Sequence, residues 1–324
     1  MDMFNPCQRF WRIITNLALI YFCWVIVMIN HRPAYGRYLM GYLDERLIDK
    51  RNMGTYVYDD VCEFNWPNFS SKLDHYFLVH LGDWFLSSFV LRDFYMLHIW
   101  SVMDEIIELS WQHILPHFGE CWWDHCIIDL LLSNTPAITM GLFVINKFKL
   151  VKYDFWYRYD KDGNELPFLQ WGIWQCHRKF GIMCYISAFM KVHFLNGFFI
   201  NSILSIPPVH PFPVLRLLMW FAIGALAFRE GYDDGRTWNT VERYFKEVSG
   251  RYRWLGIALL STEALMCYKY RLNDPNIQLD AVTPLYVSVP WAITIMFMVG
   301  YYCYLRFKKD RTLKYPIEEV KRYK

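Results

Sequence analysis

The sequence lacks the features that mark several common classes of protein. It has no basic block interleaved with aromatic residues, no low-complexity segment and no internal repeat, so nothing in it predicts a partner nucleic acid. Neither G-x-x-x-x-G-K-[ST] nor G-x-G-x-x-G occurs, so no nucleotide-binding signature is present. The nine cysteines show no metal-binding spacing. The long apolar runs therefore carry most of the information.

Those apolar runs dominate the composition. Of the 324 residues, 55% are hydrophobic and 19% are aromatic, which is too apolar for a soluble domain of this length. Charged residues make up 20%, and they cluster between the apolar runs. Polar loops between apolar segments, with aromatic residues at the membrane–water interfaces, are typical of multi-span membrane proteins. The sequence therefore predicts an all-α polytopic membrane protein.

About eight membrane helices are expected. They cover residues 11–29, 76–91, 94–111, 125–145, 180–205, 214–228, 254–268 and 283–305. The basic start of the first run also fits a signal peptide, but the run lacks an A-x-A exit, and an uncleaved helix is favoured. Residues 1–307 would then form a single transmembrane catalytic domain.

The distribution of lysine and arginine predicts the orientation. Alternating the sides of the membrane places the two termini and the loops 147–179 and 229–253 together, and these segments hold the excess of Lys and Arg. Such segments are cytosolic by the positive-inside rule. Residues 308–324 would thus be a basic cytosolic tail. The loops at about 31–74 and 112–124 would face the opposite side, the lumen.

One stretch, 103–134, carries many charged and imidazole groups although it begins and ends in apolar sequence. These groups are Asp104, Glu105, Glu108, His113, His117, Glu120, Asp124, His125 and Asp129. A carboxylate at the bilayer centre costs about 2.5–3.5 kcal/mol, so three deep and unpaired ones would cost ~8–10 kcal/mol. The usual compensation is a bound cation, a proton pathway or a catalytic site.

The expected topology brings three of these groups and His80 to one depth. His80 lies about a turn from the luminal end of its helix, and Asp129 lies about a turn from the luminal start of another. Glu105 and Glu108 share a helix face near the luminal end of a third helix, because they are three residues apart. At a rise of about 1.5 Å per residue, all four lie within ~10 Å of one depth.

This set of groups suits a specific kind of chemistry. Carboxylate oxygens without cysteine ligands favour a hard cation, calcium or magnesium, and calcium tolerates irregular geometry. His80 beside such a site would serve as a general base or a nucleophile. Phospholipid headgroups lie at this depth, so the residues indicate metal-assisted phosphoryl chemistry on a lipid headgroup.

At these same residues the sequence resembles a known family. VHLGDWFLSSFVLRDF (79–94), DEIIELSWQHILPHF (104–118) and GECWWDHCIIDLLLSN (119–134) are similar to the eukaryotic base-exchange phosphatidylserine synthases. The resemblance continues upstream through FWRIITNLALIYF and GYLDERL, and more loosely downstream to about residue 307. It implies a multi-pass enzyme of the endoplasmic reticulum membrane. This enzyme would exchange the choline or ethanolamine of a phospholipid, phosphatidylcholine or phosphatidylethanolamine, for L-serine with Ca2+.

The resemblance also implies which polar residues are essential, and the expected catalytic residues are His80, Glu108, Asp124 and Arg92. Among the essential acids and amides we infer that the calcium ligands are Glu105, Glu120, Asp129 and Asn134, with Glu108 and Asp124 in support. Whether His80 deprotonates serine or attacks phosphorus stays open here. In two places the chain departs from the family pattern: His117 stands where the family has Asn, and the chain begins at the family's third membrane helix. The donor lipid and a homodimer are left open as well.

Other features carry weaker expectations. Cys62 and Cys121 both fall in luminal loops and are expected to form a disulfide, and Asn68 begins a glycosylation sequon. Glu263 is expected to be paired structurally, and His98, His113 and His125 to be interfacial or structural. The segment from Asp233 to Arg236 matches only the start of the CDP-alcohol transferase motif. The alternative functions are a cation transporter or channel, and a phospholipase D-type hydrolase that replaces serine with water.

Overall fold

The computed structural model describes most of the chain. The described residues are 6–47, 62–113, 115, 118–160, 162–204, 206, 210–236, 249–272 and 283–308. His117 and almost all of the expected cytosolic tail lie outside them. The regular elements of the described residues are helices, and their one β feature is an isolated bridge between Tyr159 and Glu165.

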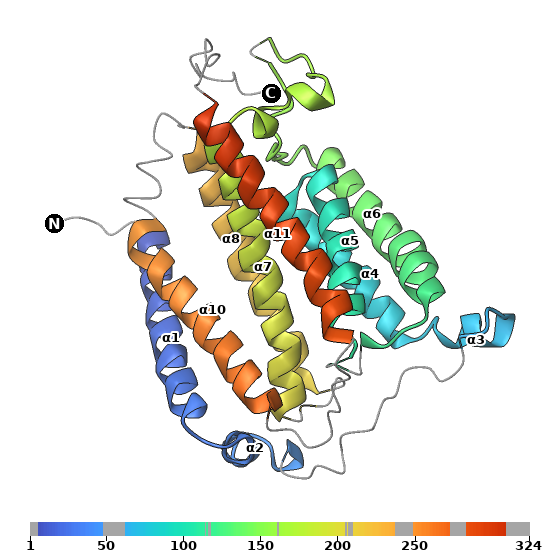
Figure 1. Ribbon diagram of the computed structural model, residues 1–324, viewed down its shortest axis with the longest axis vertical. Coiled ribbons are helices and arrows are strands. Elements are labelled where there is room, and N and C mark those ends of the chain that lie inside the picture. Colours follow the sequence, from blue (N-terminus) through green and yellow to red (C-terminus); the bar gives the residue numbers. More distant parts are fainter. Residues whose placement is uncertain are drawn as a thin grey trace. The chain divides into compact units, whose positions relative to one another are not determined.

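The helices follow the apolar runs of the sequence (Figure 1). They are α1 (Pro6–Ile29), α2 (Pro33–Gly41), α3 (Trp66–Ser71), α4 (His75–Leu91), α5 (Phe94–Trp111), η4 (Asp124–Asn134), α6 (Thr135–Lys147), α7 (His177–Leu204), α8 (Pro211–Arg236), α10 (Ser249–Leu272) and α11 (Thr283–Phe307). Short 3-10 turns occur at Glu45–Leu47, Phe168–Gln170 and Gly172–Trp174.

Five helical segments of the described chain are long and apolar enough to cross a membrane. They are Arg9–Ile29, Asp124–Lys147, His177–Leu204, Pro211–Arg229 and Leu285–Phe307, and Phe77–Leu91 is apolar but shorter. The expectation of an all-α membrane protein is therefore confirmed. The remaining expected spans form α5 and α10, which are helical but carry acidic residues.

The chain divides into two compact units. The first comprises Met1–Thr55, Phe189–Leu215 and Thr240–Gln278, and the second comprises the rest. In the first unit α1 packs against α10. The buried Glu263 accepts hydrogen bonds there from the Tyr21 hydroxyl (2.5 Å) and the Asn196 amide (3.2 Å). Both oxygens of Glu263 thus have partners, as a structural role requires.

The second unit contains α4, η4 and α6 in mutual contact, with α5 alongside (Figure 1). Helices α4 and α6 approach closely because small residues face each other. A Cβ at Gly141 would lie 2.5 Å from the Cβ of Ser88. Small residues allow such close packing of membrane helices. The close approach brings the start of α4, and hence His80, alongside η4.

The connection between α4 and α5 is anchored by Asp93. Its carboxylate caps α5 by accepting the backbone N–H of Met96 (2.8 Å), and it also accepts the indole N–H of Trp156 (3.1 Å). Burial raises the pKa of Asp93 to about 6, although Arg158 lies 3.6 Å away. Asp93 thus joins the start of α5 to the loop that precedes α7.

Candidate functional site

A π-helix provides the framework of the candidate site. Over Asp124–Asn134 the backbone forms η4, an 11-residue π-helix that continues into α6. In an α-helix with 3.6 residues per turn, residues five apart differ in direction by about 140°. In a π-helix the hydrogen bonds join residues i and i+5, and the wider turns bring residues five apart much closer in direction than an α-helix does. π-Helical turns are rare and are frequent at functional sites.

The five-residue spacing gathers three polar side chains. Asp124, Asp129 and Asn134 follow each other at intervals of five, and all three are at most 4% exposed. The π-helix therefore presents two carboxylates and an amide along one side. An α-helix over the same residues would spread these groups around its circumference.

Helix α5 supplies a second row of acids that faces the first. Glu105 and Glu108 are both buried, one turn apart. The Oε2 atom of Glu105 lies 2.8 Å from the Nδ1 atom of His125. The Asn134 amide donates to Glu105 Oε1 (3.4 Å) and to the Ser101 hydroxyl (2.9 Å). Glu105 is thus held between two residues of η4.

The arrangement can hold a cation. Ligand atoms of Glu105, Glu108 and His125 lie within 4.8 Å of one another, and so do those of Glu120, His125 and Asp129. Two buried acceptor-capable atoms near them, Asn134 Oδ1 and His125 Nε2, have no hydrogen-bond partner among the described residues. Carboxylate and amide oxygens are the ligands that calcium takes. The oxygen donors of this set therefore fit a calcium ion, whereas the imidazole nitrogen of His125 is not one of its usual ligands.

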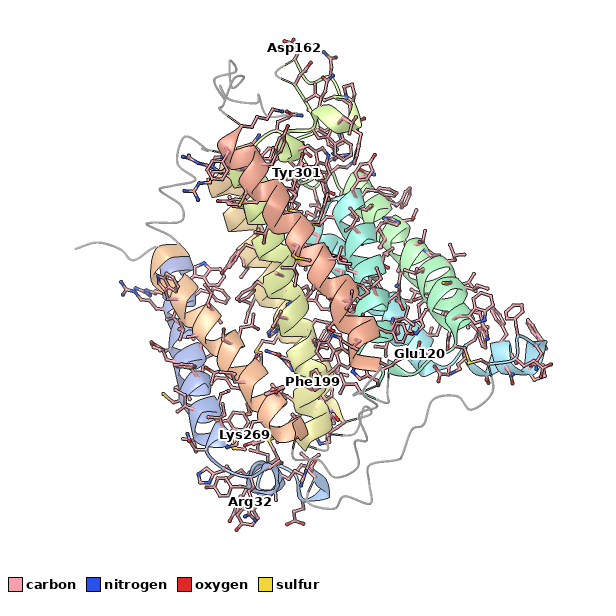
Figure 2. All side chains as sticks on the ribbon, in the orientation of Figure 1. Arg32, Glu120, Asp162, Phe199, Lys269 and Tyr301 are labelled. Atoms are coloured by element: carbon pink, nitrogen blue, oxygen red, sulfur yellow. A yellow bond between two sulfur atoms is a disulfide. The ribbon has the colours of Figure 1, made fainter. Side chains whose placement is uncertain are left out.

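The pKa of Glu120 is consistent with a cation site at this cluster. Glu120 lies in the connection between α5 and η4 (Figure 2). Burial, with the nearby charges of Asp129 and Asp124, raises the pKa of Glu120 to about 8. Without a bound cation the carboxylate thus resists ionisation, because its charge would be poorly solvated and close to like charges.

Two partly exposed basic groups lie at the edge of the acidic cluster. His80, with 35% of its side chain exposed, places Nδ1 4.0 Å from Asp129 Oδ1. Lys72, with 13% exposed, places Nζ 3.3 Å from Asp124 Oδ2. The buried acidic cluster thus meets the protein surface at the imidazole of His80 and the ammonium group of Lys72.

A disulfide joins the segment before α4 to this site. Cys62 is bonded to Cys121, the residue after Glu120. The neighbouring Trp123 is buried, packs on Phe69 of α3 with ring centroids 6.3 Å apart, and donates its indole N–H to the Cys62 carbonyl (3.4 Å). The segment 62–72 is thereby held against the start of η4.

Comparison with known proteins assigns the chain to a family. The family model for phosphatidyl serine synthase matches residues 6–271. The chain belongs to the phosphatidyl serine synthase family. It is 29% identical to phosphatidylserine synthase 2 of Rattus norvegicus over 99% of this chain and 70% of the relative. Against the Homo sapiens phosphatidylserine synthase 2 it is also 29% identical, over 96% of this chain and 66% of the relative.

Plant relatives carry a different name. The chain is 25% identical to CDP-diacylglycerol–serine O-phosphatidyltransferase 1 of Arabidopsis thaliana, over 83% of this chain and 67% of the relative. Both kinds of name describe phosphatidyl-transferring enzymes, so the expected transferase class is confirmed. The names differ in that only the plant one specifies CDP-diacylglycerol as donor.

Most of the residues expected from the family resemblance come together, but Arg92 does not. It follows the last residue of α4, twelve residues and thus about 18 Å along the helix axis from His80. Its backbone has φ 49°, and its guanidinium donates to the Phe89 carbonyl (2.8 Å) and, more weakly, to the Val151 carbonyl (3.4 Å). The structure therefore places Arg92 at a helix end, apart from the acidic cluster.

Asn68 lies outside the cluster as well. It belongs to α3, where its side-chain amide donates to the Glu63 carbonyl (2.8 Å). That nitrogen is the atom to which a glycan would be attached. Of the histidines expected to be structural, His98 contacts the Phe94 carbonyl (2.9 Å) within its own helix.

The sequence argument missed His125 as a member of the site. It is 1% exposed and belongs to both groups of candidate ligands, next to Glu105. It precedes Asp129 by four residues, and residues four apart share one face of a helix. That spacing was the available signal for its membership of the site.

Proposed function

We propose that this chain makes phosphatidylserine by calcium-dependent base exchange at the luminal face of the endoplasmic reticulum membrane. The headgroup of phosphatidylcholine or phosphatidylethanolamine would be replaced by L-serine. One observation carries the proposal: a partly exposed His80 lies 4.0 Å from Asp129, a member of a buried acidic cluster that fits a cation. Family membership supports a product formed from serine and a phosphatidyl group.

His80 is placed to transfer protons. Its Nδ1 atom lies 4.0 Å from the carboxylate of Asp129, and its side chain is 35% exposed and so can be reached by a substrate. In one route His80 takes the proton of the serine hydroxyl, the serine oxygen attacks phosphorus, and the departing choline or ethanolamine oxygen receives the proton. In the other route a His80 nitrogen attacks phosphorus and the choline or ethanolamine oxygen leaves with a proton from solvent; the serine hydroxyl oxygen then attacks phosphorus, loses its proton to solvent and displaces the imidazole.

The acidic cluster would serve the same step. Glu105, Glu120, Asp129 and Asn134 would hold calcium, with Glu108 and Asp124 in support. When bound, calcium supplies positive charge next to the phosphate. One phosphodiester is exchanged for another, so no activated nucleotide is needed. This agrees with a sequence that lacks G-x-x-x-x-G-K-[ST] and G-x-G-x-x-G.

The test is incorporation of labelled L-serine into lipid by membranes that carry this chain. Phosphatidylcholine, phosphatidylethanolamine and CDP-diacylglycerol are supplied in turn, with calcium or with a chelator. We expect calcium-dependent labelling with at least one of the first two donors. Labelling from CDP-diacylglycerol alone would refute base exchange, and the absence of labelling from all three would refute phosphatidylserine synthesis.

Two variants test the role of the histidine. His80→Ala should abolish labelling, whereas His98→Ala, which removes an imidazole on α5, should leave it intact. Labelling that survives His80→Ala would overturn the role given to His80. Release of choline in the absence of serine would instead indicate a hydrolase, and calcium uptake into sealed vesicles without lipid chemistry would indicate a transporter.

A further inference from the structure

The position of Lys72 is fixed by the segment that the disulfide attaches to the site. Lys72 is the C-cap residue of α3, and its backbone N–H donates to the Phe69 carbonyl (3.2 Å). Phe69 in turn packs on Trp123, the residue before Asp124. The ammonium group therefore reaches the start of η4 from a well-anchored backbone, and it ends 3.3 Å from Asp124 Oδ2.

Lys72 and His80 lie beside successive acids of the same helix. Lys72 contacts Asp124, and His80 approaches Asp129 five residues later. Because η4 is a π-helix, these two acids lie on one side, about a turn apart. The ammonium and the imidazole are thus neighbours along the edge where the buried cluster meets the surface.

Both substrates of the proposed reaction carry a negative charge. The lipid has a phosphodiester, and serine has an α-carboxylate, yet each must approach a cluster that contains buried carboxylates. Lys72 brings a permanent positive charge to the opening, whereas the charge of His80 depends on its protonation. A compact ammonium group binds either kind of anionic oxygen.

We propose that Lys72 is the anion-binding residue of this site and holds an anionic oxygen of the substrate, phosphate or carboxylate, next to His80. The proposal rests on the proposed function and adds a substrate-positioning residue to it. Asp124 would hold the ammonium in place until the substrate enters. The competing explanation is that Lys72 only neutralises Asp124.

Binding measurements test the proposal without turnover. Thermal unfolding of purified parent chain, Lys72→Ala and Lys72→Arg is followed with added L-serine, or with phosphatidylcholine in detergent micelles. We expect the parent to be stabilised, Lys72→Ala to lose stabilisation by one of the two ligands, and Lys72→Arg to retain part of it. Equal stabilisation of parent and Lys72→Ala, or none in the parent, would overturn the proposal.

Kinetics then identify which anion is bound. A charge-assisted hydrogen bond corresponds to a loss of about 10- to 100-fold, so kcat/KM should fall by that factor in Lys72→Ala. A rise confined to the KM for serine would assign the carboxylate, and a change in the lipid KM or in kcat would assign the phosphate. Lys152→Ala, which removes an exposed lysine of the loop after α6, should match the parent.

A double variant separates substrate binding from charge balance. If Lys72 only neutralises Asp124, then Lys72→Ala should have no further effect in an Asp124→Asn background, and that result would overturn the proposal. If Lys72 binds substrate, the double variant should lose a further 10-fold or more, about the value of one charged contact. A parent that binds both ligands but shows no exchange would refute the proposed function and leave the anion site supported.

Discussion

The contact between His125 and Glu105 gives a quantitative prediction about the acidic cluster. The imidazole is buried, and Nδ1 lies 2.8 Å from Glu105 Oε2. His125→Ala removes this partner and leaves Glu105 with the weaker donor Asn134, 3.4 Å away. Losing a hydrogen bond to a buried charge costs about 1.5–3 kcal/mol, and breaking a buried ion pair costs about 3–5 kcal/mol. We expect a loss of about 3 kcal/mol in the free energy of unfolding without calcium.

The same substitution should weaken calcium binding. Partners that orient a metal ligand contribute about 10- to 100-fold to metal affinity. His125→Ala should therefore raise the calcium concentration that gives half-maximal thermal stabilisation by about 10-fold. His125→Gln retains an N–H donor, so it should recover most of the lost free energy of unfolding and most of the lost calcium affinity.

Thermal unfolding in detergent, followed by tryptophan fluorescence over a calcium titration, measures both quantities. His98→Ala is the control, because His98 contacts the Phe94 carbonyl of its own helix and lies in α5 like Glu105. Two results would refute the reasoning. One is an unchanged unfolding temperature of His125→Ala in chelator, and the other is an unchanged calcium midpoint.

Three further predictions concern the surroundings of the site. Burial raises the pKa of Asp93 to about 6, so the folded state binds a proton more tightly than the unfolded state, and stability falls by about 3 kcal/mol as the pH rises from 4 to 7. Asp93→Asn should remove this fall in stability between pH 4 and 7, as measured by unfolding at several pH values. An unchanged fall in the variant would show that Asp93 does not cause it. Gly141→Ala should push α4 from α6, lose about 1–3 kcal/mol and reduce exchange, whereas Gly82→Ala, with nothing within 4 Å of the added Cβ, should do neither. Cys62→Ser with Cys121→Ser should lower stability by up to about 4 kcal/mol for a loop closed across 59 residues, and equal unfolding temperatures with and without reductant in the parent would argue against the disulfide.

The sequence was sufficient for the helices because their apolar runs are long. All eight expected runs are helical in the structure. Glu105 and Glu108 could be placed on one face because an α-helix brings residues three apart together, and the structure buries both. His80 could be placed near Asp129 because both lie about a turn from matching helix ends, and the structure brings them to 4.0 Å.

The rest depended on tertiary contacts that no local pattern encodes. The contribution of His125 depends on its contact with Glu105 of α5, a partner that spacing within one helix does not predict. The position of Lys72 depends on the disulfide and on the packing of Trp123, which join segments far apart in the chain. Arg92 is a different case: the family motif grouped it with the acids, but the helix period alone places it at the opposite end of α4 from His80.

The π-helix also affects the thickness of membrane that this part of the chain can cover. The span Asp124–Lys147 has 24 residues, which as a regular α-helix would extend about 36 Å. Eleven of these residues are in η4, whose wider turns advance less per residue. The span is therefore shorter than 36 Å and closer to the ~30 Å thickness of the hydrocarbon core. Because η4 forms one end of this span, we expect its acidic side chains to lie near the level of the lipid headgroups, where a phosphodiester can reach them.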